Sequence, residues 1–187
     1  MSADQQPAPT LGQVLGQSGG CPEVVERGGK RWKIGWPVAA AKVCLERLVA
    51  AAAFEEIRSM KEDLSAQAYS ELFEGHRADI QARKYQTFGE GWDRVMGRSD
   101  GSGGELFLLS LMRTEHPEAT IDDAKRLKLL YDDQLTLALD EVAPAFFQVL
   151  AEDEKVPPEA RPGLVLKLKE NWERAKLKRA GQGPPSS

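Results

Sequence analysis

Apolar residues recur along most of the chain at alternating steps of three and four positions, the spacing of one face of an α-helix. The helices that this spacing predicts lie near residues 38–52, 64–80, 105–115, 120–150 and 164–177. The first stripe comprises Val38, Ala41, Leu45, Leu48 and Ala52, and the second comprises Leu64, Ala68, Leu72, Phe73, His76 and Ile80. Thr120, near two aspartates, is typical of a helix start. The stretch from there to residue 150 predicts one or two helices, with a kink at Pro144.

Glycine residues interrupt this helical pattern and mark turns and loops. Near the N-terminus, the glycine pair 28–29 separates two short runs, residues 23–27 and 30–34. Paired glycines accept the positive φ of a two-residue primed turn, so the arrangement predicts a β-hairpin. We also expect a break at the glycines of residues 88–92 and a loop over residues 98–104.

The amino-acid composition agrees with a helical fold. The chain of 187 residues contains 22 Ala and 21 Leu, against 11 Val, 4 Ile and 5 Thr. Residues that lose little side-chain freedom in a helix therefore outnumber strand formers by about two to one. This balance excludes a β-sandwich, a barrel or a doubly wound sheet, and it predicts a mainly α fold: a helical bundle with a short N-terminal β-hairpin.

Composition also divides the chain into four parts. Residues 1–22 are rich in Gln, Pro, Gly and Ser and predict a flexible arm. Residues 23–156 form the helical domain with its hairpin, and residues 157–180 form a basic amphipathic C-terminal helix that follows a proline pair. Residues 181–187 are rich in Gly, Pro and Ser and predict a disordered tail.

The sequence predicts a cytoplasmic location. The first residues show no basic segment followed by an apolar core, so we expect no signal peptide. No uncharged apolar run approaches the ~18 residues that a membrane span needs. Two cysteines, Cys21 and Cys44, lack a pairing motif and fit a reducing compartment.

The residues capable of catalysis are few and scattered. His76 lies on an apolar stripe, which favours a packed side chain, and His116 precedes a proline where it could satisfy the terminal carbonyls of a helix. Cys44 is interpreted as a small hydrophobic residue, and residues 101–104 lack the Lys-Ser/Thr of a phosphate-binding loop. Adjacent acidic pairs diverge by about 100° on a helix and do not converge on one site. We therefore expect no enzyme, no catalytic residue, no metal site and no cofactor.

Charge is distributed unevenly. Residues 161–179 hold seven basic and two acidic residues, whereas the whole chain has a net charge of −4. This basic patch could be a solvated helix, a protein contact or a nucleic-acid contact. Twelve acids against four bases in residues 105–154 argue against nucleic acid, because phosphates would be repelled. The basic patch comprises Lys167, Lys169, Arg174, Lys176, Lys178 and Arg179, beside Trp172.

Two segments carry a family resemblance. Residues 106–113, followed by residues 116–124 (HPEATIDDA), resemble an element of the tail assembly chaperones of long-tailed phages, prophages and gene transfer agents. Residues 28–34 (GGKRWKI), with Leu45 and Glu46 in the next helix, are similar to the hairpin of that family. The stretch 55–98 and the basic C-terminal helix fall outside the resemblance.

The resemblance implies a non-catalytic role in the bacterial host cytoplasm. Such chaperones bind the long helical tape-measure protein, keep it soluble and help tail-tube subunits to polymerise around it. Two alternatives are an adaptor that stays in the particle, at the head–tail junction or in the tail, and a nucleic-acid accessory protein that uses the basic patch; self-association is left open. Residues 106–112 could instead be a buried central helix. Candidates for an apolar scaffold or partner groove are Trp92, Leu106, Phe107, Leu109, Phe146 and Phe147.

Overall fold

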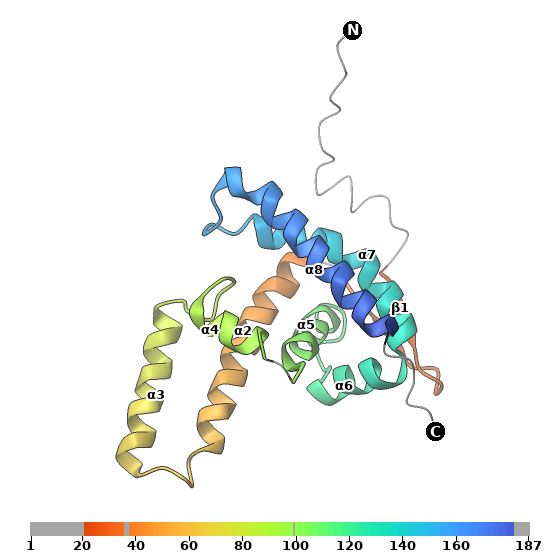
Figure 1. Ribbon diagram of the computed structural model, residues 1–187. Helices are drawn as coiled ribbons and strands as arrows, with labels where there is room; N and C mark the ends of the chain where they lie inside the picture. The colour runs from red at the N-terminus through yellow and green to blue at the C-terminus, as the bar shows by residue number, and fades with distance from the viewer. Residues whose placement is uncertain (1–20, 36–37, 99, 182–187) are drawn as a thin grey trace.

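The computed structural model describes residues 21–35, 38–98 and 100–181, with side chains described to residue 174. Within these ranges the chain forms helices α2 to α8, a 3₁₀ turn and one two-stranded hairpin (Figure 1). The mainly α fold with a short N-terminal hairpin is therefore confirmed. The predicted flexible arm up to residue 20, and the predicted tail from residue 182, lie outside the described residues.

The hairpin pairs β1 (Glu23–Val25) with β2 (Arg31–Lys33) in antiparallel register, with Val24 opposite Trp32. The predicted two-residue primed turn is wrong. Glu26 N–H donates to the carbonyl of Lys30 (2.9 Å), and Gly29 N–H donates to the carbonyl of Glu26 (2.8 Å). This pattern closes a three-residue loop in which Gly29 alone of the glycine pair takes a positive φ, 81°.

Helix α2 (Val38–Ser59) is the axis of the fold, and α4, α5 and α7 pack against it. Its predicted stripe is correct up to Leu45, but Leu48 and Ala52 are only half-buried, and the neighbouring Val49 and Ala53 enter the core instead. Residues 48–54 are all apolar, so periodicity alone could not select the buried face. The residues of α2 that are buried are Val38, Ala41, Leu45, Val49 and Ala53.

Helix α3 (Ala66–Gln81) lies antiparallel beside the C-terminal half of α2, and the two helices project together from the rest of the molecule (Figure 1). We call this pair the α2–α3 arm. The N-terminus of α3 is capped by the Ser65 hydroxyl, which accepts a hydrogen bond from the Ala68 N–H. His76 is the buried residue of α3, whereas Leu72 and Ile80 of the predicted stripe remain exposed. The arm therefore has little core of its own.

Glycines allow close helix packing where the sequence predicted a break and a loop. Helix α4 (Glu90–Met96) begins within the predicted break, and α5 (Ser102–Met112) begins within the predicted loop. A Cβ on Gly103 would lie 2.5 Å from the Met96 carbonyl oxygen, and one on Gly91 would lie 2.6 Å from the Tyr85 ring. These two glycines are required because backbone and ring approach them closely.

The remaining helices complete the bundle. Helix α6 (Ile121–Leu130) starts with the predicted Thr120 cap, here a capping box with Asp123, and α7 (Asp132–Ala151) continues through Pro144. After the 3₁₀ turn η1 (Pro158–Ala160), α8 (Arg161–Gly181) packs along α7. The Trp172 indole N–H donates to Asp140 (2.9 Å), which fixes α8 to α7.

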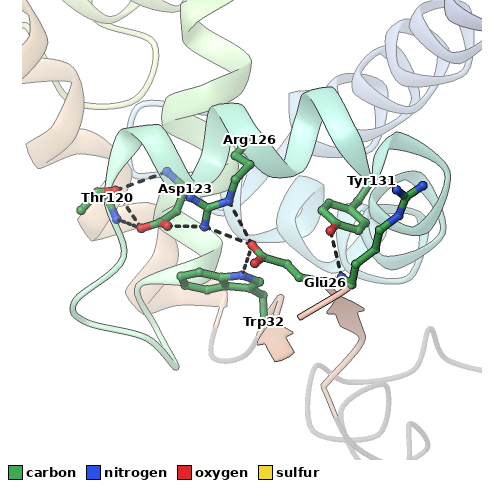
Figure 2. A network of polar contacts seen from close by, with 7 residues as sticks. Glu26, Trp32, Thr120, Asp123, Arg126 and Tyr131 are labelled. Carbon is green, nitrogen blue, oxygen red and sulfur yellow. Dashed lines mark hydrogen bonds and ion pairs between the residues drawn. The ribbon is translucent and has the colours of Figure 1, made fainter. Parts of the chain in front are cut away.

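A polar network fixes the hairpin to α6 (Figure 2). The Glu26 carboxylate accepts hydrogen bonds from the Trp32 indole N–H (2.9 Å) and from Arg126 Nη2 (3.0 Å). Arg126 also donates to Asp123 (2.7 Å), and the Tyr131 hydroxyl accepts from the Arg27 backbone N–H (2.9 Å). The Trp32 hydrogen bond is the main cause of a lowered Glu26 pKa, and Arg126 lowers it further.

His116 contributes to the same attachment, in a different way from the predicted helix cap. Its Nε2 accepts a hydrogen bond from the Lys33 backbone N–H (3.0 Å), and its ring meets the edge of Trp32 at 5.1 Å. The His116 backbone N–H, rather than the ring, bonds the Met112 carbonyl at the end of α5. The imidazole therefore connects the segment before α6 to strand β2.

Replacing Glu26 should destabilise the fold, because the indole N–H of fully buried Trp32 would lose its acceptor. We expect Glu26→Ala to lower the free energy of unfolding by about 1–3 kcal/mol, measured by urea denaturation. Glu23→Ala is the control, since the Glu23–Arg31 ion pair is exposed and should contribute less than about 0.5 kcal/mol. Equal effects of the two substitutions would contradict the role of Glu26.

Candidate functional site

The apolar residues that the sequence proposed for partner binding lie in or against the core. Trp92, Leu106, Leu109 and Phe146 are 7%, 8%, 2% and 2% exposed. Phe107 is half-buried with its ring against Phe146 at 4.8 Å, and Phe147 is half-buried against Trp172 at 6.5 Å. These residues form a scaffold, and α5 is a buried central helix. Trp92, Leu106, Leu109 and Phe146 are too buried to form an open groove, whereas Phe107 and Phe147 keep part of their surface exposed.

The basic patch is only partly described. Lys167, Lys169 and Arg174 are exposed on α8, and Glu170 and Glu173 lie among them on the solvent side. These two acids reduce the local positive charge that a phosphate backbone would encounter. The side chains of Lys176, Lys178 and Arg179 lie outside the described residues.

An open apolar surface occurs on the outward face of α2. Two adjoining hollows, of about 660 Å³ and 350 Å³, share Ala51 and follow this face from Ala40 to Phe54. We call them together the α2–α3 groove. Its first part is lined by Ala40, Val43, Cys44, Arg47, Leu48, Ala51 and Arg113, and its second by Ala50, Ala51, Phe54, Phe73, His76, Arg77 and Ile80.

The groove exists because α2 is apolar on two opposite faces. Between Val38 and Phe54 the helix carries three charged residues, Lys42, Glu46 and Arg47. The inward face fills the core, whereas the outward face places Val43, 48% exposed, beside solvent. A helix that is hydrophobic nearly all round is normally covered on all sides, so the outward face is a surface on which a partner can pack.

A network of polar groups fixes which face of α2 points outward. Lys42 Nζ lies 2.6 Å from the Asp153 carboxylate, and Glu46 accepts hydrogen bonds from the Thr87 N–H (3.0 Å) and hydroxyl (2.7 Å). Burial of Asp153 opposes its ionisation, but hydrogen bonds from Lys42 and from the Lys155 backbone outweigh burial and lower its pKa. The polar side of α2 is thereby attached to the two turns that contain Thr87 and Asp153.

His76 forms the floor between the two helices of the arm. Its ring stacks on Phe54 at 5.4 Å, and its Nδ1 lies 2.9 Å from the Tyr85 hydroxyl. Arg94 donates to the same hydroxyl (3.3 Å), so the Tyr85 hydroxyl joins His76 and Arg94 in one polar cluster at the base of the arm. Burial lowers the pKa of His76, with Asp79 opposing this effect and Arg94 adding to it.

The opposite side of the arm has a different electrostatic character. A hollow of about 320 Å³ there is lined by Ala53, Ile57, Met60 and Leu72, but also by acidic residues. These acids are Glu56, Glu71 and Asp79, of which Glu56 pairs with Arg98 and Asp79 with Lys84. The α2–α3 groove is lined by arginines instead, so the two sides of the arm differ in charge.

Comparison with protein-family models, with curated proteins and with solved structures finds no match for this chain. Within the described ranges, His, Cys, Asp and Glu residues form no group of three or more that could hold a metal ion. No described helix is both long enough and apolar enough to span a membrane. The candidate site therefore rests on the geometry of the groove.

Sequence reasoning missed this groove for two reasons. The stretch 55–98, which contains α3, lies outside the family resemblance, and the leucine-rich residues 106–112 are the more apolar segment. Two signals were present in the sequence. Residues 48–54 are apolar on every side of their helix, which is more apolar surface than one core face requires. The stripe from Leu64 to Ile80 is a second apolar surface that needs a neighbour.

The arm should become less stable in mild acid. The folded-state pKa of His76 lies below its usual value of 6.5, so its contribution is present above that pH and is lost as pH falls through the folded-state pKa. We expect amide exchange in α3 to accelerate when pH is lowered to about 5, after correction for the intrinsic exchange rate. In His76→Gln, which cannot titrate, this acceleration should disappear; if it persists, another group is responsible.

Proposed function

We propose that the chain is a non-catalytic assembly chaperone of a long-tailed phage, a prophage or a gene transfer agent. In this proposal it acts in the host cytoplasm and holds a helical segment of the tape-measure protein in the α2–α3 groove while tail-tube subunits polymerise. The sequence resemblance over residues 23–50 and 104–150 supports the choice of partner. The groove supports the mode of binding.

One observation carries the proposal: an apolar groove remains open along the outward face of α2, and α3 borders its second part. Val43 and Ile80, 48% and 50% exposed, line its walls beside the half-buried Phe54 and Phe73. Amphipathic helices bind such grooves through apolar residues spaced three and four apart. A third helix laid between α2 and α3 would complete a small bundle and cover the apolar residues that the arm leaves exposed.

The rest of the structure is a packed base that supports this surface. The helix α5 is buried on nearly all sides, and the hairpin is fixed to α6 by the Glu26 network. The arm projects from this base (Figure 1), and Arg94 and the Glu56–Arg98 ion pair lie on the side of the arm opposite the groove. A partner helix could therefore reach the groove without displacing the core.

Glutamate placed in the groove should abolish the chaperone effect. We expect co-expression with the tape-measure protein to keep that protein soluble, and Val43→Glu with Ile80→Glu to lose this effect, because buried carboxylates oppose apolar contact. Leu129→Glu is the matched control, since Leu129 is 81% exposed on α6. If the wild-type chain neither solubilises nor co-purifies with the tape-measure protein, the proposed function is wrong.

Mass spectrometry of purified particles separates a chaperone from an adaptor. A chaperone leaves after assembly, so we expect the chain to be absent from mature particles. An adaptor of the head–tail junction or the tail would be present in a fixed ratio to the tube subunits. Detection at such a ratio would replace the chaperone proposal with the adaptor alternative.

A further inference from the structure

The charged side chains that line the α2–α3 groove are all basic. They are Arg47 and Arg113 in the first part, and Arg77 in the second. Val43, Arg47, Ala50 and Ile80 also line an adjoining hollow, whose other charged residues are Arg83 and Glu46. The Glu46 carboxylate is already held by Lys42 and Thr87. We call Arg47, Arg77, Arg83 and Arg113 the rim arginines.

The positive charge of this rim is available to a ligand. No ion pair of Arg47 occurs in the described part of the chain, and Arg113 uses its Nε to donate to the Ala119 carbonyl (2.9 Å). Arg77 pairs with Glu74 at 3.4 Å and Arg83 with Glu154 at 3.2 Å, but all four side chains of these pairs are more than half exposed. Exposed pairs contribute little energy and can exchange partners.

We infer that the α2–α3 groove selects an anionic amphipathic helix, one whose apolar stripe is flanked by aspartates or glutamates. This inference rests on the proposed function and adds the chemistry of the bound segment. The apolar floor supplies contact area, and carboxylates beside the stripe meet the rim arginines. From Ala40 to Phe54 the floor extends about 21 Å, the length of about four helical turns.

The ends of this chain do not match that chemistry. Residues 1–20 contain one carboxylate side chain, Asp4, and residues 182–187 contain none. The other side of the arm, which shares His76 with the groove, is lined by three acids and one arginine, and it would not favour the same ligand. Neither of these two segments is therefore the ligand that the inference describes, and the charge of the lining favours this side of the arm.

Charge should affect both affinity and its dependence on salt. Complementary charges increase the association rate, whereas like charges placed together at an interface oppose binding. Arg47 lies on the same row of α2 as Val43 and Ala51, and both Arg47 and Arg77 are exposed, so dissolved ions screen their attraction to a bound carboxylate. A helix with the same apolar stripe but basic flanks would meet the arginines with like charge.

Three synthetic helical peptides test the inference against the full-length chain. They share one leucine stripe and carry Glu, Gln or Lys on its flanks, and their binding is measured by fluorescence anisotropy at two salt concentrations. We expect the Glu peptide to bind about tenfold more tightly than the Gln peptide, and the Lys peptide to bind most weakly. The preference for Glu should shrink at high salt.

Charge reversal locates the effect. In Arg47→Glu with Arg77→Glu, the order of the three peptides should reverse, while circular dichroism shows an unchanged fold because both side chains are exposed. Lys167→Glu, at an exposed position on α8, is the matched control and should keep the wild-type order.

The remaining outcomes each decide the question. Equal binding of all three peptides would overturn selection by charge and leave the helix-binding function standing. If no peptide binds while the tape-measure protein is still solubilised, the groove is not the site. Concentration-dependent self-association that Arg47→Glu abolishes would assign the groove to a second copy of the chain, which also overturns the inference.

Discussion

The orientation of α2 about its own axis is the constraint on which the rest of the structure depends. This helix has two apolar faces, and only one of them can enter the core. Lys42 and Glu46 decide between them, because Asp153 and Thr87 hold these side chains at 2.6–3.0 Å on the flank of the helix. Because these contacts fix one side of α2, the face that contains Leu45 and Val49 points into the core. The face that contains Val43 points to solvent.

The fold consists of a densely packed base and an arm with few buried residues. The base is densely packed around α5, with the hairpin attached through Glu26, Trp32 and Arg126 (Figure 2). The arm has His76 as its one buried residue on α3, held between Phe54 and Tyr85. Regions with few buried apolar contacts open most readily, so the arm is the part of the fold best suited to accept a further helix.

The sequence predicted the features that depend on local pattern. Helical composition, the Thr120 cap and the burial of His76 follow from spacing and residue type. The start of α5 does not, because glycines that permit contact with Met96 resemble those of a loop. Which side of α2 is buried beyond Leu45 could not be predicted from spacing either, because residues 48–54 are apolar throughout. The groove is hidden from sequence for the same reason: an apolar face is identical whether a core or a partner covers it, and only tertiary packing separates the two.

Amide hydrogen exchange, measured on the free chain and on its complex with the proposed helical partner, distinguishes binding in the groove from binding elsewhere. We expect binding to slow exchange in α2 from residue 40 to residue 54 and along α3, because a helix laid in the groove would cover both. Exchange in α6 and α8 should be unchanged. Protection confined to α8, or an arm that exchanges as fast in the complex as in the free chain, would contradict the account.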